Sequence, residues 1–197
     1  SHTGSGSQTV DGIQGPVYAE TGSGSLTITS IGSEVEADTG SGGIDLRAIQ
    51  GRVKASTGSG SIRGVQVAGP VAARTGSGSV DLEVTAPGDI AVDTGSGGVE
   101  VRGVRGALQV ETGSGSVSVE GEPVRGWNLS TGSGNITVQL PNQAAFDLDA
   151  RTSSGGIYTD HPITVQGSIG KRELRGKVRG GGPLLALSTG SGSIRIE

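Results

Sequence analysis

The chain has 197 residues, of which 39 are glycine and none is cysteine or methionine, and its formal net charge at neutral pH is −4. Without cysteine it can form neither disulfides nor thiolate metal sites, and it has no catalytic thiol. Only 31% of the residues are hydrophobic and 2% are aromatic, a composition typical of flexible chains. No apolar run approaches the ~20 residues of a membrane-spanning helix, and no signal peptide is recognised.

A Thr-Gly-Ser-Gly motif recurs along the whole chain and outweighs this composition. Copies up to Thr131 follow one another every 18 or 19 residues, a degenerate copy begins at Thr152, and the last begins at Thr189. A fixed period of this length is the signature of a repeat protein in which each unit stacks on the next. The clean copies begin at Thr3, Thr21, Thr39, Thr57, Thr75, Thr94, Thr112, Thr131 and Thr189.

Each repeat is expected to contain two short strands. After the motif, apolar and polar residues alternate, as in Leu26-Thr27-Ile28, and the same alternation precedes the next motif, as in Val35-Glu36-Ala37. A period of two indicates strands with one face in a core and the other in solvent. The first inward column reads Gln8, Leu26, Ile44, Ile62, Val80, Val99, Val117, Ile136, Ile157 and Ile194, and the column two residues before each threonine reads Ala19, Ala37, Ala55, Ala73, Val92, Val110, Leu129, Ala150 and Leu187.

Two corners separate these strands. The Gly-Ser-Gly of the motif supplies the positive φ values that a sharp corner needs. A second corner falls near glycines such as Gly51 and Gly106, each preceded by another inward apolar residue; these apolar residues are Ile13, Ile31, Ile49, Val67 and Val104. The serine of the first corner is expected to form a hydroxyl ladder, each one near its counterpart in the next coil. The column is Ser5, Ser23, Ser41, Ser59, Ser77, Ser96, Ser114, Ser133, Ser154 and Ser191.

Stacking of such units predicts an all-β fold, a single-domain parallel β-solenoid, or β-helix, of about ten 18-residue coils. At roughly 4.8 Å per coil the rod is on the order of 45 to 50 Å long. Small alanines make it narrow at first, and it should thicken towards the C-terminus, where Trp127 and Phe146 are expected in the core. For Trp127 the alternative is an exposed ring on which a sugar stacks.

The pattern breaks between Thr152 and Thr189, and residues 160–183 are predicted to be an irregular basic insertion that caps the last coil. It is either a protruding hairpin or a coil plus a loop, and the hairpin is favoured because Leu174 and Val178 alternate with charged residues. Its five cations, Lys171, Arg172, Arg175, Lys177 and Arg179, are the candidate ligand-binding residues. The solenoid domain spans residues 3–197, and residues 1–2 are expected to be an expression scar whose parent protein carried a targeting segment elsewhere.

The repeated Thr-Gly-Ser-Gly-Ser/Gly-apolar-x-apolar unit, and the glycine-rich closing segment from Gly180 to Ile196, resemble the bacterial putative-adhesin family of β-strand-repeat domains of unknown function. The resemblance covers essentially the whole chain. It implies a bacterial, envelope-associated domain with no catalytic motif to transfer.

Chemistry-bearing motifs are sparse. A Ser-His-Asp site would depend on His161, which precedes Pro162 outside any nucleophile elbow, and no glycine-rich corner continues as a phosphate loop. Glu20 and Asp38 would stack one coil apart, which leaves calcium as an alternative to solvated charges. An ice-binding face is interrupted by residues such as Arg63, and two glycosylation sequons, at Asn128 and Asn135, are taken as accidental. We therefore expect no enzyme activity, no cofactor and no metal.

Two functions remain open. The first is a rigid structural or adhesin-like module at the bacterial cell surface or in the periplasm, whose partner is an envelope polymer, a surface protein or a second copy, with no nucleic acid. The alternative is a regulatory or sensor domain that binds an anionic or membrane-active envelope ligand through residues 171–179. Reversing the basic charges distinguishes them, because adhesion along the rod survives it and ligand sensing does not.

Overall fold

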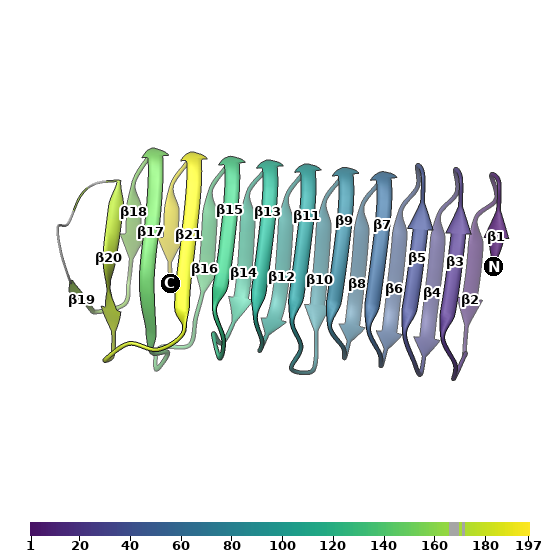
Figure 1. Cartoon of the computed structure of the whole chain (residues 1–197), viewed down its shortest axis with the longest axis horizontal. Helices are drawn as coiled ribbons and strands as arrows, with labels where there is room; N and C mark the ends of the chain where they lie inside the picture. The colour runs from purple at the N-terminus through teal and green to yellow at the C-terminus, as the bar shows by residue number, and fades with distance from the viewer. Residues whose placement is uncertain (166–169, 171) are drawn as a thin grey trace.

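Two long sheets lie face to face along the rod (Figure 1). The computed structural model describes residues 1–165, 170 and 172–197, with the backbone alone for Val165, and within these residues it contains strands and turns but no helix. No helix in the described part of the chain is therefore long and apolar enough to cross a membrane. The expectation of an all-β parallel solenoid is confirmed.

Each repeat gives one strand to each sheet, because the two corners reverse the chain between them. The 12-stranded sheet runs β1 (His2–Thr3), β3 (Val17–Thr21), β5 (Val35–Thr39), β7 (Val53–Ser59), β9 (Val71–Ser77), β11 (Ile90–Ser96), β13 (Leu108–Ser114), β15 (Trp127–Ser133), β21 (Leu184–Ser191), β17 (Phe146–Ser154), β20 (Glu173–Val178) and β19 (Ile163–Val165). The 10-stranded sheet, read from the other end, runs β18 (Ile157–Thr159), β22 (Ile194–Ile196), β16 (Ile136–Gln139), β14 (Val117–Gly121), β12 (Val99–Val104), β10 (Val80–Val84), β8 (Ile62–Val67), β6 (Ile44–Ile49), β4 (Leu26–Ile31) and β2 (Gln8–Asp11).

Equivalent residues of neighbouring coils face one another in parallel pairing. Val92 of β11 lies opposite Ala73 of β9 and Val110 of β13. The predicted inward columns form one continuous core between the sheets, with most members less than 4% exposed. Ile13 is an exception: predicted inward, it is 41% exposed, because its coil is covered on one side only.

Larger side chains fill the core towards the C-terminus, as the sequence predicts. Alanines such as Ala37 and Ala55 fill it near one end, while Trp127 and Phe146 are 1% and 0% exposed near the other. The indole Nε1–H of Trp127 donates a 3.0 Å hydrogen bond to the carbonyl oxygen of Gly106. Trp127 is thus a core residue, and the sugar-platform alternative is wrong.

The number of turns differs from the expected ten: about eight turns of about 18 residues wind in sequence. After β16 the stacking order departs from the chain order, because β21 and β22 pair directly with β15 and β16, whereas β17 and β18 lie beyond them (Figure 1). The motifs at Thr152 and Thr189 are therefore not two further successive turns.

The described strands of the basic segment, β19 and β20, are part of the 12-stranded sheet. Strand β20 pairs antiparallel with β17 on one side and with β19 on the other. These two strands extend the 12-stranded sheet beyond the parallel stack, so the edge of β17 is covered.

Candidate functional site

The buried threonine of the motif ties each first corner to the preceding coil through its hydroxyl group. The hydroxyl of Thr57 donates to the carbonyl oxygen of Gly42 in the preceding coil, and Thr75 does the same with Gly60. The threonines that begin the motifs from Thr21 onwards are only 1–6% exposed. The ladder continues through the rearranged coils, where Thr189 donates to Gly134 and Thr152 to Gly192.

The serine column is exposed along its whole length. Ser96 lies opposite Ser77 and Ser114 in the strand register, so neighbouring serines are close as expected. Across the described chain, however, none of the hydrogen bonds joins two side chains of this column. The column therefore offers solvent a row of hydroxyl groups at one corner.

One cation of the basic segment, Arg175, lies in an ion-pair network with acids. Arg175 lies 3.4 Å from Asp149 and 3.0 Å from Glu173, and Arg151 lies 3.0 Å from Asp149 and 3.5 Å from Glu173. Two arginines and two acids thus form a network whose formal charges cancel.

The remaining basic residues are spread out. Lys177 is half-buried opposite Asp147, Arg179 donates a 3.0 Å hydrogen bond to the carbonyl oxygen of Asn142, and Arg172 is exposed. Lys171 lies outside the described residues. The strand brings Arg175 and Lys177 to one face of the sheet, but the four described cations do not form one cluster.

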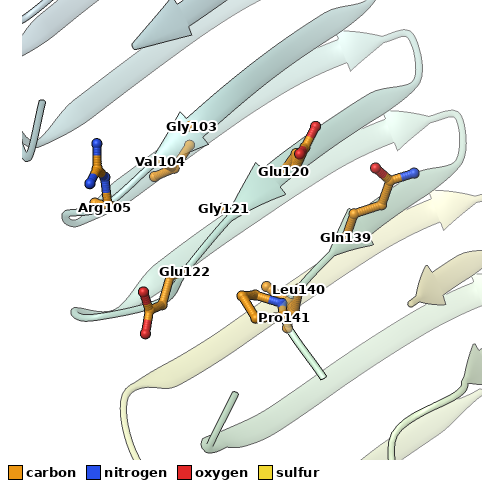
Figure 2. A pocket seen from close by; sticks show the side chains of 9 residues that line it. All are labelled: Gly103, Val104, Arg105, Glu120, Gly121, Glu122, Gln139, Leu140 and Pro141. Atoms are coloured by element: carbon orange, nitrogen blue, oxygen red, sulfur yellow. The ribbon is translucent and has the colours of Figure 1, made fainter. Parts of the chain in front are cut away.

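An open groove of about 470 Å³ lies beside the second corner, where the predicted apolar column stops (Figure 2). Val104 is the last inward residue of that column; the next coil has Glu122 at this position, and the one after has Pro141. The strand register also shifts here, so that Val104 faces Gly121. Because the next coil places no apolar side chain over Val104, the groove is open.

Polar side chains from three coils surround this groove. Figure 2 shows Arg105 after β12, Glu120 and Glu122 at the end of β14, and Gln139 at the end of β16. Arg105 also donates a 2.8 Å hydrogen bond to the carbonyl oxygen of Thr85. The groove combines donors and acceptors over an apolar floor but contains no nucleophile paired with a base, which suits binding of a polar ligand. The end of the apolar column after Val104 is the one signal of this groove in the sequence, and it does not reveal the shift in register.

A second groove, of about 650 Å³, lies on the outer face of the 12-stranded sheet. Its floor includes Ala72 and Ala91, two small residues in the outward column, with Lys54 on one side and Gln109 on the other. Small side chains between longer ones create this depression.

Charges on the outer faces are paired along or across strands. The hydrogen bond from Lys54 to Glu36 raises the pKa of the lysine, and the corresponding bond from Arg102 to Glu100 raises the pKa of the arginine. All four side chains are well exposed, so these pairs contribute little to stability. They give each face a mixed charge.

Among the described residues, neither the acids nor His161 is arranged as in a metal site or a hydrolase site. Glu20 and Asp38 are neighbours in the register, yet no group of three or more histidine, aspartate or glutamate side chains in the described part of the chain is placed to hold a metal. His161 is 7% exposed and packs edge-on against Phe146, with ring centroids 5.7 Å apart. It is a core residue of the C-terminal region.

No curated protein matches the chain significantly in sequence. The crystal structure of a putative cell adhesion protein from Clostridium sporogenes is similar to part of the chain, with 22% sequence identity and a TM-score of 0.47. The match covers 57% of this chain and 56% of that one. A family model described as Toastrack DUF4097 matches residues 52–197, which is most of the sequence, and the chain therefore belongs to the Toastrack DUF4097 family.

Proposed function

We propose that the chain is a non-enzymatic, adhesin-like interaction module of the bacterial cell envelope, a rigid rod that presents a repeated surface to an envelope polymer, a surface protein or a second copy. The observation that carries this proposal is the in-register stacking of the coils. Because Lys54, Ala72 and Ala91 occupy the same position in successive coils, outward side chains form straight columns.

Such columns suit an extended partner. Parallel strands repeat about every 4.8 Å, so a polymer lying along the rod meets the same backbone geometry at each coil. Mixed charges and few exposed apolar side chains make each contact weak, and many contacts together give useful affinity. The groove at Glu122 and Gln139 offers hydrogen-bonding groups for a polar segment of that partner.

The test is binding of the purified chain to whole bacterial cells and to isolated envelope polymers, with variants that change one face at a time. Arg74 and Asp93 face each other on the 12-stranded sheet, and Arg63 and Asp81 on the 10-stranded sheet. Exchanging the members of each pair, R74D/D93R or R63D/D81R, alters the pattern and keeps the net charge. A third variant, E122A/Q139A, removes two of the four polar side chains around the groove.

We expect the wild-type chain to bind saturably. Binding should weaken severalfold in the variant whose changes lie on the contacting face and should be unchanged in the variants of the other surfaces. Equal binding by all variants, or no binding by the wild-type chain to any cell or polymer, contradicts an adhesive surface.

The alternative, a sensor for an anionic or membrane-active ligand, is tested in the same assay. Arg172→Glu with Lys177→Glu reverses two cations and leaves the network of Arg175 with Asp149 and Glu173 intact. Adhesion along the rod predicts that binding survives this change. Loss of binding in this variant alone supports the sensor.

A further inference from the structure

Strands β21 and β22 each lie between two strands that precede them in the chain. In chain order β17 follows β16, yet the coil formed by residues 184–197 lies between β15–β16 and β17–β18 (Figure 1). It pairs in parallel on both sides. Residues distant in sequence thus complete a slot that is one coil wide.

The slot holds its coil through the same core contacts and hydrogen bonds that join the other coils. Leu185 lies opposite Trp127 on one side and Leu148 on the other, and the four apolar side chains Leu185, Leu187, Ile194 and Ile196 are 0–1% exposed. The threonine ladder also passes through this coil. None of these contacts depends on which copy of the chain supplies the coil.

The slot is also expected to fill late in folding. The edges of β15–β16 and β17–β18 carry the same pattern and are close in sequence, so they can pair with each other first. Residues 184–197 must then find their place from farther along the chain, and long-range pairing is slower than local pairing. During that interval the segment is open to a second molecule.

A strained connection joins the segment to the rest of the chain. Arg179, Gly180 and Gly181, which follow β20, all have positive φ, of 50°, 90° and 89°. For Arg179 this conformation is unfavourable. An extended connection would release it, so opening of this hinge, residues 179–183, is favoured locally.

We propose that β21–β22 is an exchangeable coil, and that two copies of the chain form a dimer by inserting residues 184–197 of each into the slot of the other. Reciprocal exchange rebuilds every slot contact and closes with two-fold symmetry, so only the hinge changes. Exchange of this kind links rods pairwise whether or not they are adhesive.

The test uses cysteines, which the natural chain lacks. Ser130 of β15 and Ser188 of β21 are register partners with outward side chains, close enough for a disulfide. Two single variants, S130C and S188C, are mixed in equal amounts, refolded together from denaturant at high concentration and oxidised. A matched control mixes E111C with S130C, because Glu111 and Ser130 are register partners on successive turns of one winding.

Exchange predicts a disulfide-linked S130C–S188C heterodimer in severalfold higher yield than the control pair gives. It also predicts that the wild-type chain, refolded at high concentration, contains a dimer by light scattering. The S130C/S188C double variant, oxidised when dilute, should be locked as a monomer that no longer dimerises. Equal heterodimer yields in the two mixtures, or a wholly monomeric wild type after concentrated refolding, overturns the proposal; the wild-type measurement holds even where a cysteine variant folds poorly.

Discussion

The side-chain hydroxyl of Thr57 donates a 2.9 Å hydrogen bond to the backbone carbonyl oxygen of Gly42, which belongs to the preceding coil. Thr57 is only 4% exposed, so this bond lies out of water. The same bond recurs from coil to coil and ties each corner to its neighbour. The serine of the motif, Ser59 in this coil, is exposed and lies outside this ladder.

Removing this hydroxyl should weaken the fold. Thr57→Val keeps the shape of the side chain and should lower the free energy of unfolding by about 1 kcal/mol or more. Ser59→Ala, at the exposed serine column of the same corner, should change it by less than about 0.5 kcal/mol. Denaturant titration of both variants measures the difference, and a larger loss from Ser59→Ala would assign the ladder to serine.

Glycine at the end of the motif is required by the close approach of coils. A Cβ on Gly60 would overlap the carbonyl group of Gly42, so Gly60→Ala should destabilise the fold by about 2 kcal/mol or more. Gly43 is the control, since its Cβ would lie 3.5 Å from Ser61 and other coils have serine at this position. Gly43→Ser should be nearly neutral in thermal unfolding. Similar losses at both sites would show that the coils do not approach closely.

A left-handed residue recurs just before the second corner. Gln66 has a φ of 57° there, whereas other coils use Gly12 and Gly103. Left-handed backbone costs a non-glycine residue about 1–2 kcal/mol and glycine's extra entropy costs about 0.5–1. Gln66→Gly should therefore stabilise the chain by about 0.5–1 kcal/mol. Gln109→Gly, in an extended strand, should destabilise it, and chemical denaturation would contradict this account if both changes had the same sign.

Trp127 should report directly on the core, because it is the sole tryptophan. Its fluorescence should be blue-shifted and insensitive to iodide in the folded state, and should shift to the red on unfolding. As a control, Asn128→Trp in a Trp127→Phe background places the ring on the outward face, where iodide should quench it. Strong quenching of Trp127 in the folded wild type would contradict its burial.

Tyr18 should titrate above its ordinary pKa. Its hydroxyl donates a 2.9 Å hydrogen bond to Glu34, and this bond, with the negative charge of Glu34, raises the pKa of the phenol. The protonated tyrosine is the form favoured by folding, so its contribution to stability is present below the unfolded pKa and is lost as the pH rises through the folded pKa, above about pH 10.

Ultraviolet titration of phenolate in a Tyr158→Phe background measures this pKa. Glu34→Gln removes the charge and should lower the pKa of Tyr18 towards its ordinary value. An unchanged titration curve would show that Glu34 does not act on Tyr18.

Much of the fold could be predicted from the columns. The burial of Trp127 and Phe146 followed from their inward register, because alternation along a strand fixes which side chains share a face. The groove beside Glu122 was not predicted, because it depends on a shift in register between β12 and β14 that no single repeat encodes. The partners of Arg175 could not be predicted either, since β17 and β20 meet only through antiparallel pairing of distant segments.

The sequence by itself determined the period, the two strands of each repeat and the side of each strand that is buried, because these follow from local alternation and from glycine corners. Only the tertiary structure decided which coils are neighbours. The segments beginning at Phe146 and Leu184 carry the same motif and pair with each other in register, so the repeat cannot distinguish which of them lies next to β15. Insertion of β21 next to β15 is a property of the whole chain, and with it comes the slot that residues 184–197 fill.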